Sequence, residues 1–421
     1  MNILLVGARG FIGSHLLDAL VTAGHRVYAT SRDGQGPARG EMDWRALDLE
    51  RLADDPEAFD WPEQVDLVIN AAGVLSTDAA QLERVQDRGP RVLFKQAALH
   101  GAGVLQISAL GAGSQAEVPF LASKAAADDY LLGLGIPAVV LRPSLVIGPG
   151  GASSGWLARL SAWPLAPVLD RQARTRPLHV DDLAGAVLAL LRRWPEPGVL
   201  PLVGPESMTQ GELLDRLRAA QGWSRGRYLQ VPRPLAALGA RLGERFGWRA
   251  LNTQLLHMAR TDNLASAEPL SAVCGYRAAS LSARLRHWPP AAASIAACWR
   301  PLLLGSLLAV WVGTALVCLG PGREAGVALL TGVGVAPGTA LGLVLAGALL
   351  DGALGLGLLW RRWRRPVLLA QMAVMVGYTA AITWLLPHAW NDPFMAVGKN
   401  LVLLAASGFA RALEPHGRKA P

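Results

Sequence analysis

The chain changes character near residue 290. Up to about Pro290, short apolar runs alternate with charged segments in which apolar residues recur at helical spacing. Beyond Pro301, four stretches are almost entirely apolar: 301–319, 341–360, 367–386 and 394–410. A membrane helix needs about 20 mainly apolar residues, so three stretches are long enough and the fourth just reaches the lower limit. The pattern predicts an N-terminal domain, a linker and an all-α bundle of four transmembrane helices, over residues 1–290, 291–300 and 301–421.

Basic residues lie at one end of these predicted spans. The run Arg361-Arg362-Trp363-Arg364-Arg365 separates the second span from the third, and Arg411, Arg418 and Lys419 follow the fourth. Loops rich in Arg and Lys stay on the cytoplasmic side of a membrane. The distribution predicts a multi-pass protein of the inner (cytoplasmic) membrane, with its N-terminal domain in the cytoplasm. No signal peptide is expected, because the first residues form a different motif.

Asp351 and Lys399 interrupt the second and fourth apolar stretches. At about 1.5 Å of rise per residue, both are expected near the middle of the bilayer. A charge at that depth is costly unless it is paired, so we expect the two side chains to pair. The pair is interpreted either as a proton or quinone site or as a structural ion pair.

The N-terminal pattern begins with a strand, a glycine-rich turn and a helix. The continuous apolar run 2–6 is typical of a buried parallel strand. It is followed by Gly7-Ala8-Arg9-Gly10-Phe11-Ile12-Gly13, a helical pattern over 15–23 and a second strand over 26–30. Such glycines let the backbone approach a pyrophosphate, which the helix N-terminus attracts. The pattern predicts an α/β Rossmann-type fold with a doubly wound parallel sheet; the alternative is a purely structural turn.

The end of the second predicted strand bears on the choice of cofactor. NAD-specific folds usually place Asp or Glu there, to hold the ribose 2′-OH. Here the strand ends in Ala29-Thr30-Ser31-Arg32, with no carboxylate before Asp33. Arg32, helped by Arg9, suits a 2′-phosphate by charge and geometry. NADP(H) is therefore the expected cofactor and NAD(H) the second choice, unless both arginines are solvated surface charges.

These motifs resemble the short-chain dehydrogenase/reductase superfamily, in its extended or atypical branch related to NAD-dependent epimerases and dehydratases. The resemblance covers most of residues 1–288 and implies a small substrate lobe after the sheet. Asp48 resembles the adenine-contacting Asp of that family, and Asn70-Ala71-Ala72-Gly73 resembles its cofactor loop. The resemblance implies that a nicotinamide dinucleotide is held by Gly7, Arg9, Gly10, Phe11, Ile12, Gly13, Arg32, Asp48, Asn70, Ala71, Ala72, Gly73 and Lys124.

The chain departs from the family at its catalytic motif, Tyr-x-x-x-Lys. The aligned residues are Phe120-Leu121-Ala122-Ser123-Lys124, so the phenol that exchanges a proton with the substrate is missing. Lys124 remains, and Ser108 stands where the family has its catalytic Ser or Thr. Two functions are left open. One is an oxidoreductase whose acceptor, a small organic or quinone-like molecule, is protonated by water or another side chain. The other is a nucleotide-binding sensor, scaffold or assembly factor that has lost turnover.

The apolar last third resembles the DoxX-like membrane domain over roughly 298–411. This resemblance depends on the four-helix layout and on Asp392-Pro393-Phe394 leading to Gly398-Lys399-Asn400-Leu401. It implies a quinone-linked or redox function. The expected partners are therefore the dinucleotide, the lipid bilayer and a quinone or membrane redox partner.

Composition excludes several other classes. Charged residues make up only 17% of the 421 residues, against about 25% in ordinary soluble proteins, and hydrophobic residues make up 52%. The chain is thus neither disordered nor fibrous. The net charge is +8, but no basic patch interleaved with aromatic residues indicates nucleic-acid binding. The three cysteines are scattered, so neither a disulfide framework nor a metal site is expected.

Overall fold

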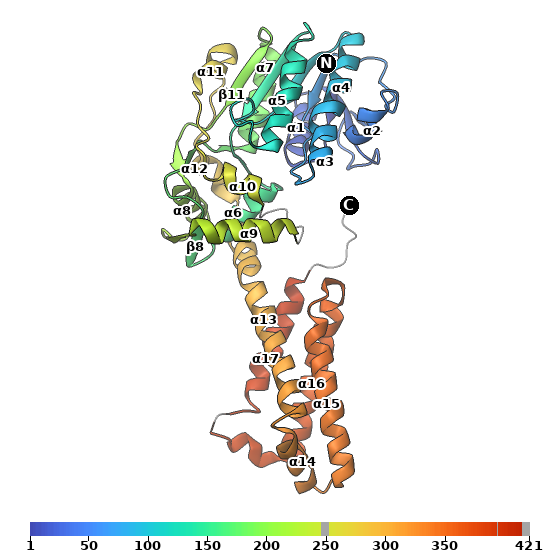
Figure 1. The fold of residues 1–421 in the computed structure, drawn as a ribbon, viewed down its shortest axis with the longest axis vertical. Coiled ribbons are helices and arrows are strands. Elements are labelled where there is room, and N and C mark those ends of the chain that lie inside the picture. The colour runs from blue at the N-terminus through green and yellow to red at the C-terminus, as the bar shows by residue number, and fades with distance from the viewer. Residues whose placement is uncertain (246–251, 394, 415–421) are drawn as a thin grey trace. The chain divides into compact units, whose positions relative to one another are not determined.

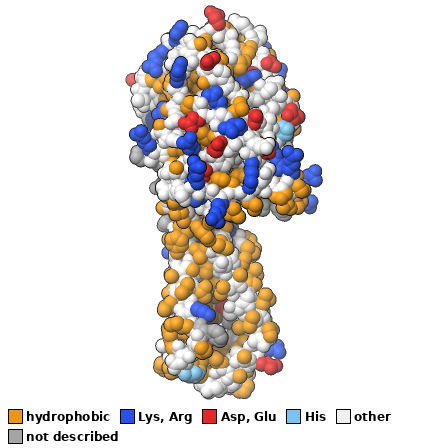
Figure 2. Space-filling model, turned by 90° about the vertical axis from the view of Figure 1, so that its left-hand side faces the viewer, with side chains coloured by type: hydrophobic (Ala, Val, Ile, Leu, Met, Phe, Trp, Pro, Cys, Tyr) orange, Lys and Arg blue, Asp and Glu red, His pale blue; other side chains and the backbone are white. Residues whose placement is uncertain are grey.

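The computed structural model describes residues 1–245, 252–393 and 395–414 (Figure 1). The chain divides into two compact units, Met1–Ser294 and Ile295–Pro421. Their surfaces differ. Charged side chains are scattered over the N-terminal unit, whereas hydrophobic side chains cover most of the C-terminal unit (Figure 2).

A seven-stranded parallel sheet forms the centre of the N-terminal unit, as the sequence predicts. The strand order is β11-β6-β5-β4-β1-β2-β3. The strands in chain order are β1 (Asn2–Val6), β2 (Arg26–Ser31), β3 (Met42–Ala46), β4 (Leu67–Asn70), β5 (Gly103–Ile107), β6 (Ala138–Pro143) and β11 (Gly198–Leu202). The order reverses at β1, which pairs with β2 on one side and β4 on the other. In open α/β sheets, ligands bind at the carboxyl ends of the strands beside such a switch point.

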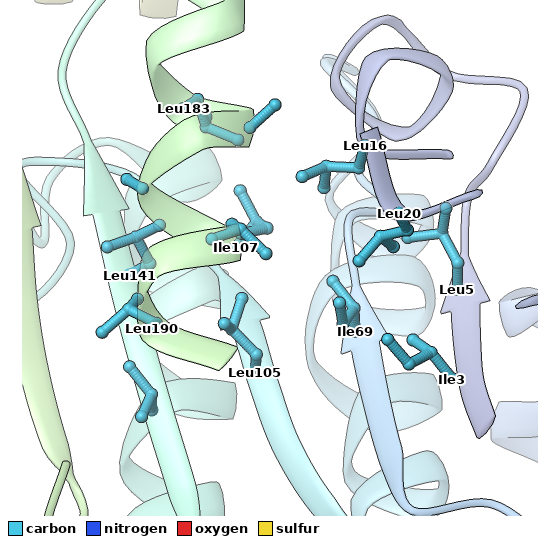
Figure 3. Close-up of a cluster of buried hydrophobic side chains, with 14 of the residues drawn as sticks. Ile3, Leu5, Leu16, Leu20, Ile69, Leu105, Ile107, Leu141, Leu183 and Leu190 are labelled. Carbon is cyan, nitrogen blue, oxygen red and sulfur yellow. The ribbon is translucent and has the colours of Figure 1, made fainter. Parts of the chain in front are cut away.

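Helices cover both faces of the sheet because its strands are apolar on both faces. Along β1, Ile3 and Leu5 belong to one buried cluster, and Leu4 and Val6 belong to the other. The first cluster, shown in Figure 3, is covered by α1 (Phe11–Thr22) and α7 (Val180–Arg192). The second is covered by α2 (Leu49–Asp54), α4 (Gly89–Leu99) and α5 (Pro119–Leu132). Between α2 and α4, α3 (Ala79–Glu83) continues into a π-helical turn, η1 (Arg84–Arg88).

A small lobe with its own apolar core follows the sheet. Its core joins α6 (Ala152–Ser161), β8 (Leu165–Val168), α8 (Gln210–Ala220) and α12 (Leu281–Arg284). Strand β13 (Arg227–Gln230) pairs in parallel with β8. The remaining elements of this unit are β7 (Val146–Ile147), β9 (Arg174–Thr175), β10 (Leu178–His179), β12 (Met208–Thr209), α9 (Arg233–Arg245), α10 (Thr253–Met258), α11 (Glu268–Cys274) and η2 (Leu285–His287).

Asp182 connects the end of this unit to the sheet. Its side chain is completely buried in α7. It accepts hydrogen bonds from the Tyr276 hydroxyl at 2.9 Å, the Ala279 amide at 3.2 Å and the Arg284 guanidinium at 2.7 Å. A buried carboxylate is tolerated when it is paired and hydrogen-bonded in this way. The segment around residues 276–284 is thereby fastened to α7.

The C-terminal unit is helical. Its elements are α13 (Ala291–Leu319), α14 (Arg323–Gly332), α15 (Pro337–Gly357), η3 (Arg361–Trp363), α16 (Arg364–Leu385), η4 (Pro387–Asn391) and α17 (Lys399–Leu413). Among the described residues, three helices are long and apolar enough to cross a membrane: Ala291–Leu319, Pro337–Gly357 and Arg361–Leu385. The fourth predicted span is shorter than expected, because α17 begins only at Lys399 and has 15 residues. Residues 291–300, predicted as a linker, are the alanine-rich start of α13.

The predicted pairing of Asp351 with Lys399 is wrong. Asp351 is buried in α15, where the Tyr378 hydroxyl of α16 donates to it at 3.4 Å. Lys399 is exposed at the first residue of α17, and no ion pair within the described part of the chain joins it to Asp351. The prediction placed Lys399 in mid-helix, whereas the helix begins at this residue.

Replacing Asp182 with Ala should destabilise the N-terminal unit by about 3–5 kcal/mol, because it leaves the Arg284 guanidinium and Tyr276 hydroxyl without their acceptor. The measurement is thermal unfolding of the purified full-length protein in detergent, followed by tryptophan fluorescence. The control is Asp181→Ala on the same helix, whose carboxylate is about half exposed and should cost under about 1 kcal/mol. Equal effects of the two substitutions would contradict the fastening role of Asp182.

Candidate functional site

The glycine-rich turn after β1 is folded too tightly for side chains. Gly7 has a φ of +79°, and a Cβ there would lie 2.9 Å from the Cα of Ala72 in the loop after β4. A Cβ on Gly13 would lie 2.1 Å from the carbonyl oxygen of Gly7. The Gly10 amide closes the turn by donating to that carbonyl at 2.8 Å. The turn therefore depends on glycine at Gly7 and Gly13.

The same turn leaves the start of α1 open to a ligand. Helix α1 begins at Phe11, and its N-cap residue, Gly10, has no side chain to satisfy the first amides. The N–H groups of the first helical turn have no partner within the helix, so they attract an anion. The predicted residues Gly10, Phe11, Ile12 and Gly13 thus come together at one positive helix end, beside the sheet's switch point.

Just after the end of β2, the structure places the carboxylate of Asp33 against Arg9. Arg9 donates to both carboxylate oxygens of Asp33, at 2.9 and 3.0 Å, and the Ser31 hydroxyl donates to Asp33 at 2.9 Å. Hydrogen bonds from Ser31 and Arg9 lower the pKa of Asp33 to about 2. Arg9 is therefore compensated by a negative charge, and Arg32 lies exposed in the same turn.

Asp48, after β3, and Asn70, at the end of β4, each hold the local backbone. Asp48 caps α2 by accepting from the Glu50 amide at 3.0 Å, which uses one of its two carboxylate oxygens. Asn70 is buried; its amide donates to Gln106 at 2.8 Å, and its oxygen accepts from the Ala72 amide at 3.2 Å. Asn70 thereby fixes the shape of the Ala71–Gly73 loop, which lies against the glycine turn.

Lys124 is buried in α5, with its ammonium group at the carboxyl ends of the central strands. It donates to the carbonyl oxygen of Ile107 at 3.1 Å and lies 5.9 Å from the centre of the Phe120 ring. A Cβ on Gly73 would lie 3.7 Å from its Nζ, so the lysine reaches the cofactor loop. Burial lowers the pKa of Lys124 to about 8, while the nearby carboxylate of Asp128 opposes the shift. This lysine is therefore easier to deprotonate than an exposed one.

Ser108 points to a buried charge cluster. Its hydroxyl donates to Asp128 at 2.7 Å, and Arg142 donates to the same oxygen of Asp128 through Nε at 3.0 Å and Nη2 at 2.9 Å. Burial raises the pKa of Asp128, against the opposing effects of Ser108, Arg142 and Lys124. The predicted residues Ser108 and Lys124 are thus brought together around Asp128, which lies four residues after Lys124 on the same helix face.

Gln86 was not among the predicted site residues. This residue is buried in the π-helical turn η1, and its amide donates to Ser123 at 3.3 Å, one residue before Lys124. Its Oε1 has no hydrogen-bond partner among the described residues. Single π-helical turns within helices are frequent at functional sites. Hydrophobic periodicity does not reveal such a turn, so the sequence offered no signal for it.

Gln254 of α10 was also missed. It accepts from the Phe120 amide at 3.1 Å and donates to the carbonyl oxygen of Ser76 at 3.0 Å. Phe120 and Gln254 lie 134 residues apart in the chain. A short strap from the C-terminal part of this unit therefore connects the start of α5 with the loop after β4.

The assembled residues fit a nicotinamide dinucleotide. A backbone cradle that any Cβ would fill lies against an uncapped helix end, and a buried lysine reaches the adjoining loop. Residues 3–200 match the NAD dependent epimerase/dehydratase family, and residues 308–408 match the DoxX-like family. The N-terminal domain is an NAD-dependent epimerase/dehydratase-type domain. The C-terminal domain is DoxX-like.

Two relatives are similar to this chain over part of its length. The "Ceramide reductase" of Caulobacter vibrioides is 29% identical over 239 residues, which cover 55% of this chain and 73% of that protein. The "NADH dehydrogenase [ubiquinone] 1 alpha subcomplex subunit 9, mitochondrial" of Arabidopsis thaliana is 26% identical over 246 residues, which cover 55% of this chain and 60% of that protein.

Solved structures of this fold are also similar. A nucleoside-diphosphate-sugar epimerase from Staphylococcus aureus has a TM-score of 0.55 at 20% identity, covering 68% of this chain and all of that one. The RMD protein of Pseudomonas aeruginosa, solved with NADPH, has a TM-score of 0.50 at 22% identity, covering 68% of this chain and 95% of that one. At such identities the likeness establishes the fold alone.

Gly13→Ala should weaken NADPH binding at least about tenfold, because the added Cβ collides with the Gly7 carbonyl and opens the cradle. The measurement is titration of the full-length protein with NADPH, followed by tryptophan fluorescence. The control is Gly155→Ala in α6, where an added Cβ would meet no atom within 4 Å. Unchanged affinity in a Gly13→Ala protein that unfolds at the wild-type temperature would contradict this site.

Proposed function

We propose that this protein is a membrane-anchored oxidoreductase that binds NADP(H) in preference to NAD(H) and reduces a carbonyl group, with Lys124 as the proton donor. The observation that carries the proposal is the buried Lys124 ammonium group, which lies beside Phe120 and reaches the Gly73 loop. We further propose two domains, residues 1–290 and 301–421, that residues 291–300 at the start of α13 join, with the N-terminal domain on the cytoplasmic side of the inner membrane. The arginines at 361–365 support this orientation.

The proposed contacts with the cofactor follow from the backbone and the charges. The first amides of α1 bind the pyrophosphate, and the exposed Arg32 binds the 2′-phosphate. The free oxygen of Asp48 contacts the adenine, and Lys124 contacts the ribose next to the nicotinamide. The nicotinamide, when bound, supplies the hydride. The full set is Gly7, Arg9, Gly10, Phe11, Ile12, Gly13, Arg32, Asp48, Asn70, Ala71, Ala72, Gly73 and Lys124.

Carbonyl reduction also needs a proton at the oxygen atom. Phe120 has no acidic hydrogen, and the Ser108 hydroxyl proton is directed to Asp128. The Lys124 ammonium group, with its pKa near 8, transfers a proton to the substrate oxygen and is reprotonated from solvent. Ser108 is then a positioning residue, because it acts on Lys124 through Asp128.

A lipid acceptor is the best-supported substrate class. The relative from Caulobacter vibrioides is named a ceramide reductase, and the chain carries three candidate membrane spans. Both favour a carbonyl group on an amphiphile that resides in the bilayer. A quinone-like acceptor, delivered by a membrane redox partner, is the alternative that the DoxX-like domain supports.

A second function is a nucleotide-binding scaffold or sensor without turnover. The absence of a hydroxyl at Phe120 favours it, and one relative is named as a subunit of an NADH dehydrogenase. The two functions differ in one measurement: NADPH oxidation by the detergent-solubilised protein, with carbonyl and quinone acceptors. NADPH binding without oxidation of either kind would favour the scaffold.

Lys124→Met should lower the rate of NADPH oxidation by about 10²–10⁴-fold, the usual contribution of a general acid. In the wild type, kcat should fall as the pH rises through about 8, because only the protonated lysine is an acid. Steady-state kinetics from pH 6 to 10 would measure both effects. The control is Lys95→Met, since Lys95 is exposed on α4. A variant at Lys124 that keeps the wild-type rate and pH profile would exclude the lysine as the acid.

Arg32→Ala should raise the Kd for NADPH about tenfold or more and leave the Kd for NADH nearly unchanged, because only NADPH carries the 2′-phosphate. Fluorescence titration with both dinucleotides measures the difference. Arg51→Ala, at an exposed position of α2, is the control. Equal weakening of NADPH and NADH binding by Arg32→Ala would show that Arg32 does not recognise the 2′-phosphate.

A further inference from the structure

Helix α9 presents a row of leucines to its surroundings. Leu235, Leu238 and Leu242 are 60, 54 and 42% exposed. Their spacing of three and four residues places them on one face of the helix. The small residues Ala236, Ala240 and Gly243 are buried on another face, against the rest of the unit. The helix therefore packs through its small residues and directs its large apolar ones outward.

Positive charge borders this leucine row. Arg241 and Arg245 are both exposed and lie one turn apart, on the side of the helix next to the leucines. Residues 225–245 contain five arginines and one glutamate, hence a net charge of +4. Leucines bordered by arginines are typical of a helix that lies in a membrane interface, where the arginines meet anionic headgroups.

The strands before α9 carry further exposed apolar side chains. Leu165 of β8 and Leu229 of β13 are about half exposed, whereas Ala166 and Val168 of β8 are buried. Because side chains alternate along a strand, Leu165 and Leu229 lie on the outer face of this strand pair. Strand β13 ends at Gln230 and α9 begins at Arg233, and β8, the partner of β13, lies at the same end of the unit as α9 in Figure 1.

The chain itself keeps this lobe close to the bilayer. Leu285 and Trp288 pack into the core that β8 shares, and the first candidate span starts only three residues after Trp288. With 29 residues, α13 is about 43 Å long. That length matches a bilayer with its headgroups, about 40–45 Å thick. The start of α13 is therefore expected at the headgroup surface, within a few residues of the lobe.

We propose that α9 is an interfacial helix whose leucine row, Leu235, Leu238 and Leu242, inserts into a bilayer surface that contains anionic phospholipids. The exposed arginines beside the row contact lipid phosphates, and the outer face of β8 and β13 extends the apolar contact. The docking surface is defined by these three leucines together with Leu165 and Leu229.

Docking at α9 would bring the membrane close to the candidate site. Glu244, near the end of α9, accepts from the backbone amide and hydroxyl of Thr253, at 2.8 and 2.6 Å. The next residue, Gln254, bonds the Phe120 amide. An amphiphilic substrate could thus pass from the interface to the strap over the site. This consequence rests on the proposed function, whereas the docking of α9 does not.

The test uses the full-length protein with its three native cysteines replaced by serine. A single cysteine introduced by Leu238→Cys carries a polarity-sensitive fluorophore, and the protein is placed singly in nanodiscs of phosphatidylcholine and phosphatidylglycerol. We expect blue-shifted emission and quenching by doxyl-labelled lipids at least about twofold stronger than for a label at Leu99→Cys. Leu99 is the matched control, because it is an exposed leucine at the end of α4.

The second part of the test reverses the charge of the two arginines beside the leucine row. Arg241→Glu with Arg245→Glu should reduce the quenching at position 238 in anionic nanodiscs. In nanodiscs of phosphatidylcholine alone, the protein that keeps both arginines should show the same reduction in quenching. Unfolding temperatures verify that every variant is folded. A label at position 238 as accessible to water as the one at position 99 would overturn the proposal. So would a shielded label that doxyl lipids do not quench, since protein would then cover the surface. Neither readout requires dinucleotide binding or turnover, so failure here is distinguishable from failure of the proposed function.

Discussion

The candidate site depends on the close approach of two backbone segments at the carboxyl ends of the strands. The turn after β1 lies against the loop after β4 so closely that a Cβ on Gly7 would lie 2.9 Å from Ala72. Asn70 holds the second loop in place through its bonds to Gln106 and the Ala72 amide. The helix end that follows is uncapped, and its amides face this cradle. Without this contact, neither the glycines nor the helix end would form an anion site.

A second constraint is the cost of burying charge. Lys124, Asp128 and Arg142 are largely removed from water, and each is tolerated because it bonds to a partner or a carbonyl oxygen. The Ser108 hydroxyl completes this cluster. Burial lowers the pKa of Lys124 although Asp128 opposes the shift, and its ammonium group lies next to an aromatic ring without a hydroxyl. With phenylalanine in place of the family's tyrosine, the site therefore still holds a group that can give up a proton near neutral pH, Lys124.

The C-terminal unit also contains a buried carboxylate, which arginines from other helices pair with. Glu414, after α17, is buried and accepts from Arg300 of α13 at 3.1 and 2.6 Å, and Arg364 lies 3.9 Å away. One carboxylate thereby joins α13, the start of α16 and the end of α17. This ion cluster lies beside apolar helices and was not predicted, because its partners are 50 and 114 residues from Glu414.

The sequence by itself determined the parallel sheet, the glycine turn and three of the four predicted apolar spans, because each is encoded by neighbouring residues with a fixed period or spacing. It also identified Phe120 as a departure from a local motif. Only the tertiary structure decided where long-range partners meet: Arg9 with Asp33, Ser108 with Asp128, and Phe120 with Gln254. It likewise placed Lys399 at a helix start, away from Asp351, since helix ends depend on packing and loop geometry more than on composition. Contacts between distant residues depend on how elements pack, and a pattern along the chain does not contain that information.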